Sequence, residues 1–107
     1  MTRLAVLSDL HANLSAIRVV RADLARRGVD QVLVLGDVVG YLARPNRVAG
    51  LVAEAGWHTI AGNYDLAVLT GGQRGADKFL KPGIGPEPRA IFAWTEQRVH
   101  QLSLIHI

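Results

Sequence analysis

Residues 31–35 form a continuous apolar run, broken only by the initial glutamine, that shows no alternation of polar side chains. A strand of this kind is buried on both faces, as in a parallel sheet covered by helices. Shorter apolar runs begin near residues 4 and 57, and the segments between them have the apolar spacing of helices. Strands that alternate with helices in this way predict an α/β fold with a parallel βαβαβ sheet.

The runs also predict where each element lies. Strands are expected at residues 4–8, 31–35 and 57–60. One helix is expected from Asn13, as its N-cap, to Arg27, and a second from Pro45 to the glycine at position 56.

The second half of the chain predicts less regular structure. A helical turn is expected at residues 66–69, followed by a loop that extends through residues 81–86. A final amphipathic helix is expected from Pro88, with apolar side chains on one face: Ile91, Trp94, Val99 and Leu102. No fourth strand is evident, so the sheet looks incomplete for a doubly wound domain.

Composition excludes several classes of function. Lys and Arg exceed Asp and Glu by 12 − 9 = 3, and this excess is scattered along the sequence, so neither nucleic acid nor a membrane surface is an expected partner. Cysteine is absent, so any metal must be held by oxygen and imidazole ligands. Asp9 interrupts the first apolar run before it reaches the length of a signal peptide, and no run approaches the ~20 residues of a membrane span. A cytoplasmic location is the expectation.

Polar side chains follow each of the three predicted strands. Asp9 and His11 come after the first strand, Asp37 lies between glycines after the second, and Asn63 follows the third. Side chains at the carboxyl ends of parallel strands meet at one edge of the sheet. If the backbone stays extended, Asp9 and His11 point to the same side. Carboxylate, imidazole and amide groups together suit a divalent metal, although each motif taken alone is also typical of an ordinary capped turn.

The ordered set Asp9-x-His11, Gly36-Asp37-x-x-Gly40 and Gly62-Asn63-x-Asp65 resembles the calcineurin-like metallophosphoesterase superfamily. The resemblance covers residues 3–70, and residues 40–46 and 93–95 further resemble a small prokaryotic single-domain branch. It implies that this chain is the first part of a metallophosphoesterase α/β sandwich. It also implies hydrolysis of a small phosphomonoester or phosphodiester.

The same resemblance assigns roles to individual residues. It implies that Asp9 and His11 bind one metal, that Asp37 bridges two metals, and that Asn63 binds the second metal and the substrate phosphate. Two divalent ions are therefore implied, with Mn²⁺ the leading expectation and Fe, Zn or Ni as alternatives. Such metals polarise the phosphoryl oxygen and activate water for attack at phosphorus.

The sequence departs from the family pattern at two points. Tyr64 stands where the family usually has a catalytic histidine, and Asp65 either orients Tyr64 or caps the following turn. A phenol donates a hydrogen bond but is not a cation near neutral pH, so slower turnover is expected. The family's later histidine motif, Gly-His-x-His, is absent from these 107 residues, which predicts an incomplete second metal site and weak activity.

Residues 102–107 are interpreted separately, because one reading frame of a transposon end used in sequencing adapters translates to this string. We expect residues 1–101 to be a partial metallophosphoesterase domain and residues 102–107 to be a non-native tail.

Two other classes of function are compatible with parts of the pattern. The degenerate site is also compatible with a non-catalytic module that binds metal or phosphate. A phosphoaspartyl phosphatase or receiver domain likewise places Asp at strand ends, but His11 disfavours that interpretation. The oligomeric state cannot be predicted from these features.

Overall fold

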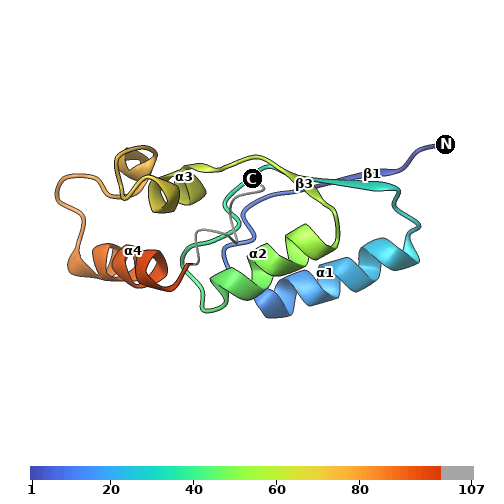
Figure 1. Ribbon diagram of the computed structural model, residues 1–107, viewed down its shortest axis with the longest axis horizontal. Coiled ribbons are helices and arrows are strands. Elements are labelled where there is room, and N and C mark those ends of the chain that lie inside the picture. Colours follow the sequence, from blue (N-terminus) through green and yellow to red (C-terminus); the bar gives the residue numbers. More distant parts are fainter. Residues whose placement is uncertain (100–107) are drawn as a thin grey trace.

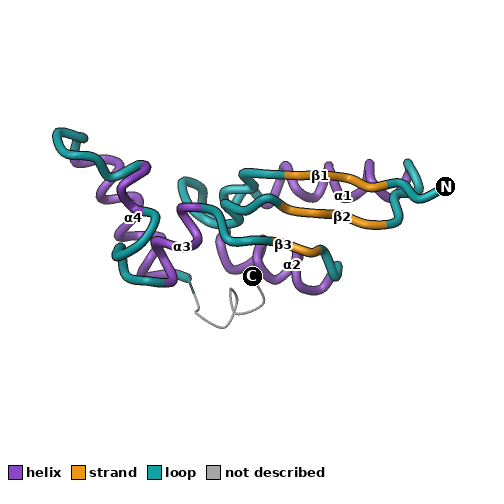
Figure 2. The backbone as a smooth tube through the Cα atoms, turned by 90° about the horizontal axis from the view of Figure 1, so that it is seen from above, coloured by secondary structure: helices purple, strands orange, loops and turns teal. Residues whose placement is uncertain are grey.

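The computed structural model describes residues 1–99, and the last eight residues lie outside the description. Three parallel strands form one sheet in the order β1-β2-β3, side by side in Figure 2. The strands are β1 (Leu4–Leu7), β2 (Gln31–Val34) and β3 (His58–Thr59). The predicted α/β class with a parallel βαβαβ sheet is confirmed.

Helices α1 (Leu14–Arg26) and α2 (Pro45–Glu54) connect the strands and lie against one face of the sheet (Figure 1). The Asn13 side chain accepts a 3.1 Å hydrogen bond from the Ala16 amide and so caps α1 as predicted. Pro45 is the first residue of α2, where its missing N–H leaves no helical bond unmade. Both predicted crossover helices are therefore confirmed to within about two residues.

The core lies between the sheet and these helices and continues beneath the loops after the strands. Its fully buried side chains include Val34, Val38, Val39, Val48 and Val52. The opposite face of the sheet is open in the described part of the chain, where Leu4, Val6 and Ile60 are each more than half exposed. Within residues 1–99 the sheet is thus covered by helices on one side only.

The third strand is shorter than expected, and the next helix begins earlier. β3 contains two residues instead of the predicted four, because only Leu33 and Val34 of β2 pair with it. Helix α3 (Asn63–Leu69) begins at Asn63, whereas a turn was expected there and a helical turn only from residue 66. The predicted site residue Asn63 consequently begins a helix and does not lie in a loop.

The last described helix also differs from its prediction. After a short 3₁₀ helix η1 (Ala76–Lys78), helix α4 (Pro86–Arg98) begins two residues before Pro88. Its buried residues are Phe92 and Thr95, whereas Trp94 is 37% exposed. Val99, directly after α4, is buried as predicted, so spacing misplaced Trp94 but not Val99. The helix packs on α2 and α3. Leu102 lies outside the described residues.

Among residues 1–99, no helix is both long enough and apolar enough to cross a membrane.

Candidate metal centre

The loops that follow β1 and β2 run beside each other and continue the pairing of the two strands. The amides of Asp9, His11 and Ala12 donate to the carbonyls of Gly36, Asp37 and Val38 at 3.0, 2.9 and 2.9 Å. These three bonds fix the position of one loop relative to the other. Asp9, His11 and Asp37 are therefore held at neighbouring strand ends by backbone contacts that do not depend on a ligand.

The backbone at these ends is left-handed, which corrects the extended conformation expected for Asp9 and His11. Asp9, His11 and Asp37 have φ values of 58°, 44° and 56°. Residues other than glycine rarely adopt this region, and such strain concentrates at functional sites. The side chains of Asp9 and His11 do lie together as predicted, but a left-handed backbone brings them together and not an extended one.

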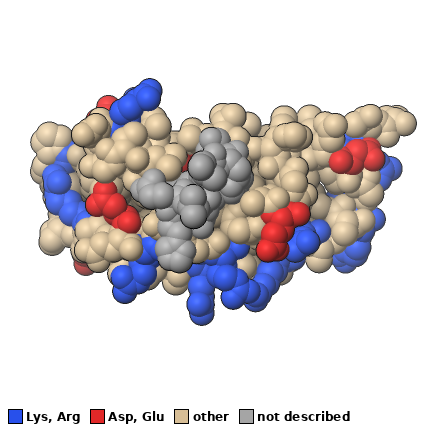
Figure 3. All heavy atoms as spheres, viewed as in Figure 1, with Lys and Arg blue, Asp and Glu red and all other residues tan. Residues whose placement is uncertain are grey.

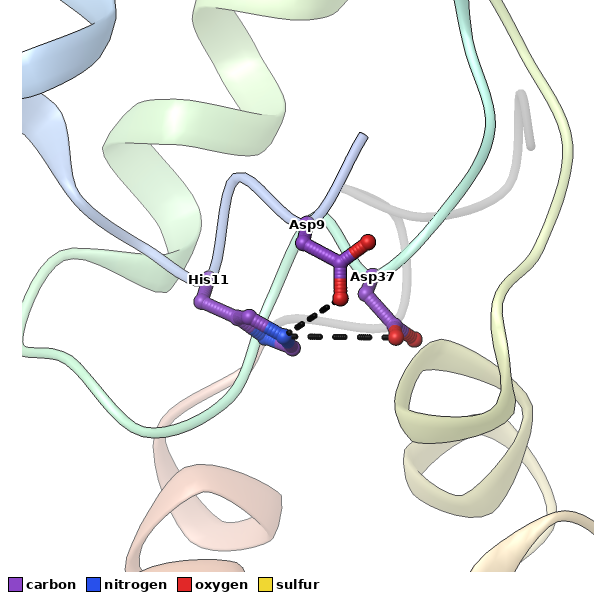
Figure 4. A group of neighbouring side chains, drawn as sticks. All are labelled: Asp9, His11 and Asp37. Atoms are coloured by element: carbon purple, nitrogen blue, oxygen red, sulfur yellow. Dashed lines mark hydrogen bonds and ion pairs between the residues drawn. The ribbon is translucent and has the colours of Figure 1, made fainter. Parts of the chain in front are cut away.

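Figure 4 shows the imidazole of His11 pointing at both carboxylates. His11 Nε2 lies 3.3 Å from Asp9 Oδ1 and 3.9 Å from Asp37 Oδ2. One ligand atom from each of the three residues lies within 4.8 Å of the other two. The Asp9 side chain is 60% exposed and the Asp37 side chain 14% exposed, so the group is open to solvent on one side.

The other ring nitrogen of His11 sets the role of Nε2. Nδ1 lies 2.9 Å from the Val39 carbonyl oxygen, which only accepts, so Nδ1 carries a proton and donates. In the neutral ring Nε2 then presents a lone pair to two carboxylates. Such a backbone partner behind a histidine is the usual support of a metal-ligating imidazole. The three residues fit a divalent cation, because a positive charge between them relieves the repulsion of their lone pairs.

The two carboxylates have different surroundings. The Ser8 hydroxyl donates to Asp9, and this hydrogen bond lowers the pKa of the Asp9 carboxyl below its usual range. Asp9 is therefore ionised at neutral pH and ready to bind a cation. Asp37 Oδ1 accepts a 3.0 Å hydrogen bond from the Tyr64 amide, while its Oδ2 faces His11.

The loop before α3 packs tightly on Asp37. A Cβ added to Gly62 would lie 2.1 Å from Asp37 Oδ1, and one added to Gly36 would lie 2.3 Å from the Gly62 nitrogen. Only glycine fits at either position. Asn63 stands between Gly62 and Tyr64, both of which contact Asp37, and it is partly buried. The third strand end thus reaches the same edge of the sheet.

Tyr64 does not join the carboxylates through its phenol. Its side chain is 1% exposed, and its ring stacks on Phe79 with a centroid distance of 4.3 Å. The hydroxyl has Thr95 and the backbone of Tyr41 as polar neighbours but makes no hydrogen bond of good geometry to the described residues. Burial raises the pKa of the Tyr64 phenol, which keeps it neutral. The centroid of the Tyr64 ring lies 6.1 Å from the centroid of the His11 imidazole.

Asp65 is fully buried and bonds to backbone amides. Oδ1 accepts from the Val39 amide at 3.1 Å and Oδ2 accepts from the Gly62 amide at 3.0 Å. Burial raises the pKa of the Asp65 carboxyl in spite of these bonds. Among residues 1–99 it makes no hydrogen bond to the Tyr64 side chain. Its contacts match the capping alternative, and they also tie the Val39 loop, which holds His11, to the start of α3.

Two groups that support the metal ligands were not predicted from the sequence. The Val39 carbonyl that fixes His11 has no signal in the side-chain pattern, because any residue supplies a carbonyl. Ser8 was adjacent to Asp9, and its capacity to donate was a usable signal. Of the remaining histidines, His58 lies in β3, while His100 and His106 fall outside the described residues.

A parallel sheet with an Asp-x-His and a second Asp at adjacent strand ends is the arrangement expected from the resemblance to calcineurin-like metallophosphoesterases. The family model described as the calcineurin-like phosphoesterase superfamily domain matches residues 2–106. The chain therefore belongs to the calcineurin-like phosphoesterase superfamily.

Two known proteins show the similarity in more detail. The chain is 40% identical over 80 residues to the uncharacterized protein MJ0912 of Methanocaldococcus jannaschii, a match that covers 75% of this chain and 32% of that protein. It is 33% identical to a metallophosphoesterase from Sphaerobacter thermophilus whose crystal structure is known, with a TM-score of 0.70. That match covers 96% of this chain and 39% of the other. The 107 residues thus span about a third to two fifths of the length of these relatives.

Proposed function

We propose that this chain supplies the first metal site and the phosphate-facing loops of an enzyme that hydrolyses small phosphate esters, either monoesters or diesters. Its natural substrate is then a phosphate-ester small molecule, and two divalent ions, with Mn²⁺ first among the candidates, are its cofactors. The convergence of Asp9, His11 and Asp37, with ligand atoms within 4.8 Å of one another, is the observation that carries the proposal. The cytoplasmic location remains a prediction.

The surroundings of each residue at the candidate metal centre suggest its proposed role. Asp9, His11 and Asp37 would hold the cation, and the Asp37 carboxylate is the candidate bridge to a second one. A divalent cation bound there polarises a phosphoryl oxygen and makes water a better nucleophile. Asn63, at the start of α3, is proposed to bind the second metal and the phosphate. Catalytic roles for Tyr64 and Asp65 stay predictions.

The non-catalytic module remains a second candidate, and one observation favours it. The Tyr64 hydroxyl is buried, so the position that the family usually gives to a catalytic histidine offers no accessible acid among the described residues. Such a site would bind metal or phosphate without turnover.

One experiment separates the two candidates. The chain is loaded with Mn²⁺, and hydrolysis of p-nitrophenyl phosphate and of bis-p-nitrophenyl phosphate is followed for the wild type, Asp37→Asn and the matched control Asp77→Asn. Asp77 is an exposed carboxylate in η1. Loss of a metal ligand should cost at least the ~10–100-fold typical of losing its supporting partners. We therefore expect Asp37→Asn to lose the activity and Asp77→Asn to keep it.

Two results would decide against the enzyme. Hydrolysis by Asp37→Asn at the wild-type rate would contradict the proposed site. Stoichiometric Mn²⁺ binding with no hydrolysis of either ester, by this chain and by a longer version that supplies the later histidine motif, would favour the non-catalytic module.

A further inference from the structure

A polar cavity opens where the amino-terminal ends of α1 and α2 meet. Its volume is about 570 Å³. We call it the arginine groove, after the three arginines in its lining: Arg18, Arg44 and Arg47. Asn13 and Ser15 add polar atoms to its wall. Arg18 is distant in the sequence from Arg44 and Arg47, so the gathering of all three was not visible in the scattered charge of the chain.

The three guanidinium groups have no partners in the described part of the protein. All three side chains are exposed, no side-chain hydrogen bond or ion pair engages them within residues 1–99, and no Asp or Glu lines the groove. By contrast, Arg26 and Arg27 at the other end of α1 pair with Asp23 at 2.9 and 2.7 Å. In Figure 3, Lys and Arg atoms gather along the lower edge of the molecule, below α1 and α2. Glu54 lines the neighbouring cavity together with Arg18 and Arg47, but no ion pair joins it to them within residues 1–99, so the groove keeps an excess of positive charge.

The orientation of the two helices adds to this charge. Leu14 and Ser15 are the first residues of α1, and Arg44 is the N-cap of α2 without a capping side-chain bond. Helix amino termini carry partial positive charge. Both helices therefore contribute the same sign of potential as the arginines.

The size of the groove selects among anions. A guanidinium group binds one phosphate through two parallel hydrogen bonds, so three of them can serve more than one phosphate. A cavity of about 570 Å³ is also in the range of sites for whole small ligands. We propose that the arginine groove binds a condensed phosphate chain, that is, a small ligand with at least two linked phosphates.

The groove begins one residue from the proposed metal centre. Ala12, which follows His11, lines the groove, and its carbonyl accepts a 3.2 Å hydrogen bond from the Arg44 amide. A phosphate chain in the groove thus lies on the loop that positions His11. Binding there needs neither a metal nor hydrolysis, so the proposal goes beyond the proposed function and does not fail with it.

The test uses the 107-residue chain with EDTA present, so that metal binding cannot contribute. Calorimetry measures the affinity for tripolyphosphate, orthophosphate and a single-stranded oligonucleotide. The variant Arg18→Gln with Arg47→Gln is compared with Arg26→Gln with Arg27→Gln, which removes the same charge. We expect the first pair to weaken tripolyphosphate binding at least about tenfold, as loss of charge-assisted hydrogen bonds does, and the second pair to stay within about twofold of the wild type.

A third variant shows whether a loss of affinity comes from the lost arginine contacts or from unfolding of the protein. Arg18→Lys with Arg47→Lys keeps the charge but not the bidentate geometry, and an intermediate loss of affinity is expected. The proposal is wrong if the wild type does not bind tripolyphosphate, if both Gln pairs lose affinity equally, or if orthophosphate binds as tightly as tripolyphosphate. An oligonucleotide that binds more tightly through the same arginines would likewise replace it with a nucleic-acid site.

Discussion

Tyr64 links the proposed metal centre to the core: its backbone faces the metal centre, and its ring faces the core. Its amide donates to Asp37 Oδ1, whereas its ring is buried against Phe79. The buried hydroxyl makes no hydrogen bond of good geometry to the described residues. A buried polar group without a partner costs about 1–3 kcal/mol. Its removal is therefore informative about both stability and chemistry.

Tyr64→Phe should leave the free energy of unfolding unchanged or raise it by up to about 1 kcal/mol, because it removes only an unpaired hydroxyl. Urea unfolding followed by circular dichroism measures this. A loss of more than about 1 kcal/mol would mean that the hydroxyl bonds to Thr95 or Tyr41 in solution. The Mn²⁺-dependent rate of the same variant tests the predicted catalytic role, since a reacting phenol cannot be replaced by phenylalanine without loss.

At the scale of residues, the sequence predicted which side chains meet but not how. Asp9, His11 and Asp37 follow buried apolar runs, and that pattern alone places them at neighbouring strand ends. The left-handed conformation of all three could not be predicted, because it is imposed by hydrogen bonds between loops 26 or more residues apart. The burial of Tyr64 depends on Phe79 and Phe92, whose position requires the fold.

Glycines set the spacing between elements at the proposed site. Gly62 caps α3 and presses on Asp37, whereas Gly50 lies within α2 with no atom within 4 Å of an added Cβ. Gly50→Ala should stabilise the protein by about 0.5–1 kcal/mol through helix propensity. Gly62→Ala should displace Asp37 and weaken Mn²⁺ binding. Thermal unfolding and a Mn²⁺ titration of both variants measure these effects.

Equal Mn²⁺ affinity in Gly62→Ala and Gly50→Ala would show that the contact of Gly62 with Asp37 does not position a ligand. A stability loss in Gly50→Ala would contradict the open space beside that glycine.

Elements with strong local signals were predicted best. The Asn13 cap, the start of α2 at Pro45 and the parallel strands follow from local chemistry and periodicity. The lengths of β3 and α3 do not, because they depend on how far β2 extends as a partner and on the Asp65 bonds to Gly62 and Val39. The exposure of Trp94 on α4 was mispredicted for the same kind of reason, whereas Val99 is buried as predicted.

At the scale of the whole molecule, the sheet has one face covered by helices and one face left open by residues 1–99. Val6 on the open face is 54% exposed, while Val34, turned toward the helices, is 1% exposed. Val6→Thr should change the free energy of unfolding by less than about 0.5 kcal/mol, whereas Val34→Thr should cost about 1–3 kcal/mol by burying an unpaired hydroxyl. Urea unfolding of the two variants measures the difference. Equal costs would mean that the open face is covered in solution.

Mn²⁺ binding by the chain tests the central claim most directly, because every proposed step depends on a cation between Asp9, His11 and Asp37. Electron paramagnetic resonance reports free Mn²⁺ during titration of the wild type, His11→Gln and the control His58→Gln, which alters an exposed histidine of β3. We predict saturable binding by the wild type and His58→Gln, and an affinity about 10–100-fold lower in His11→Gln. Equal affinities for all three proteins would contradict the metal centre.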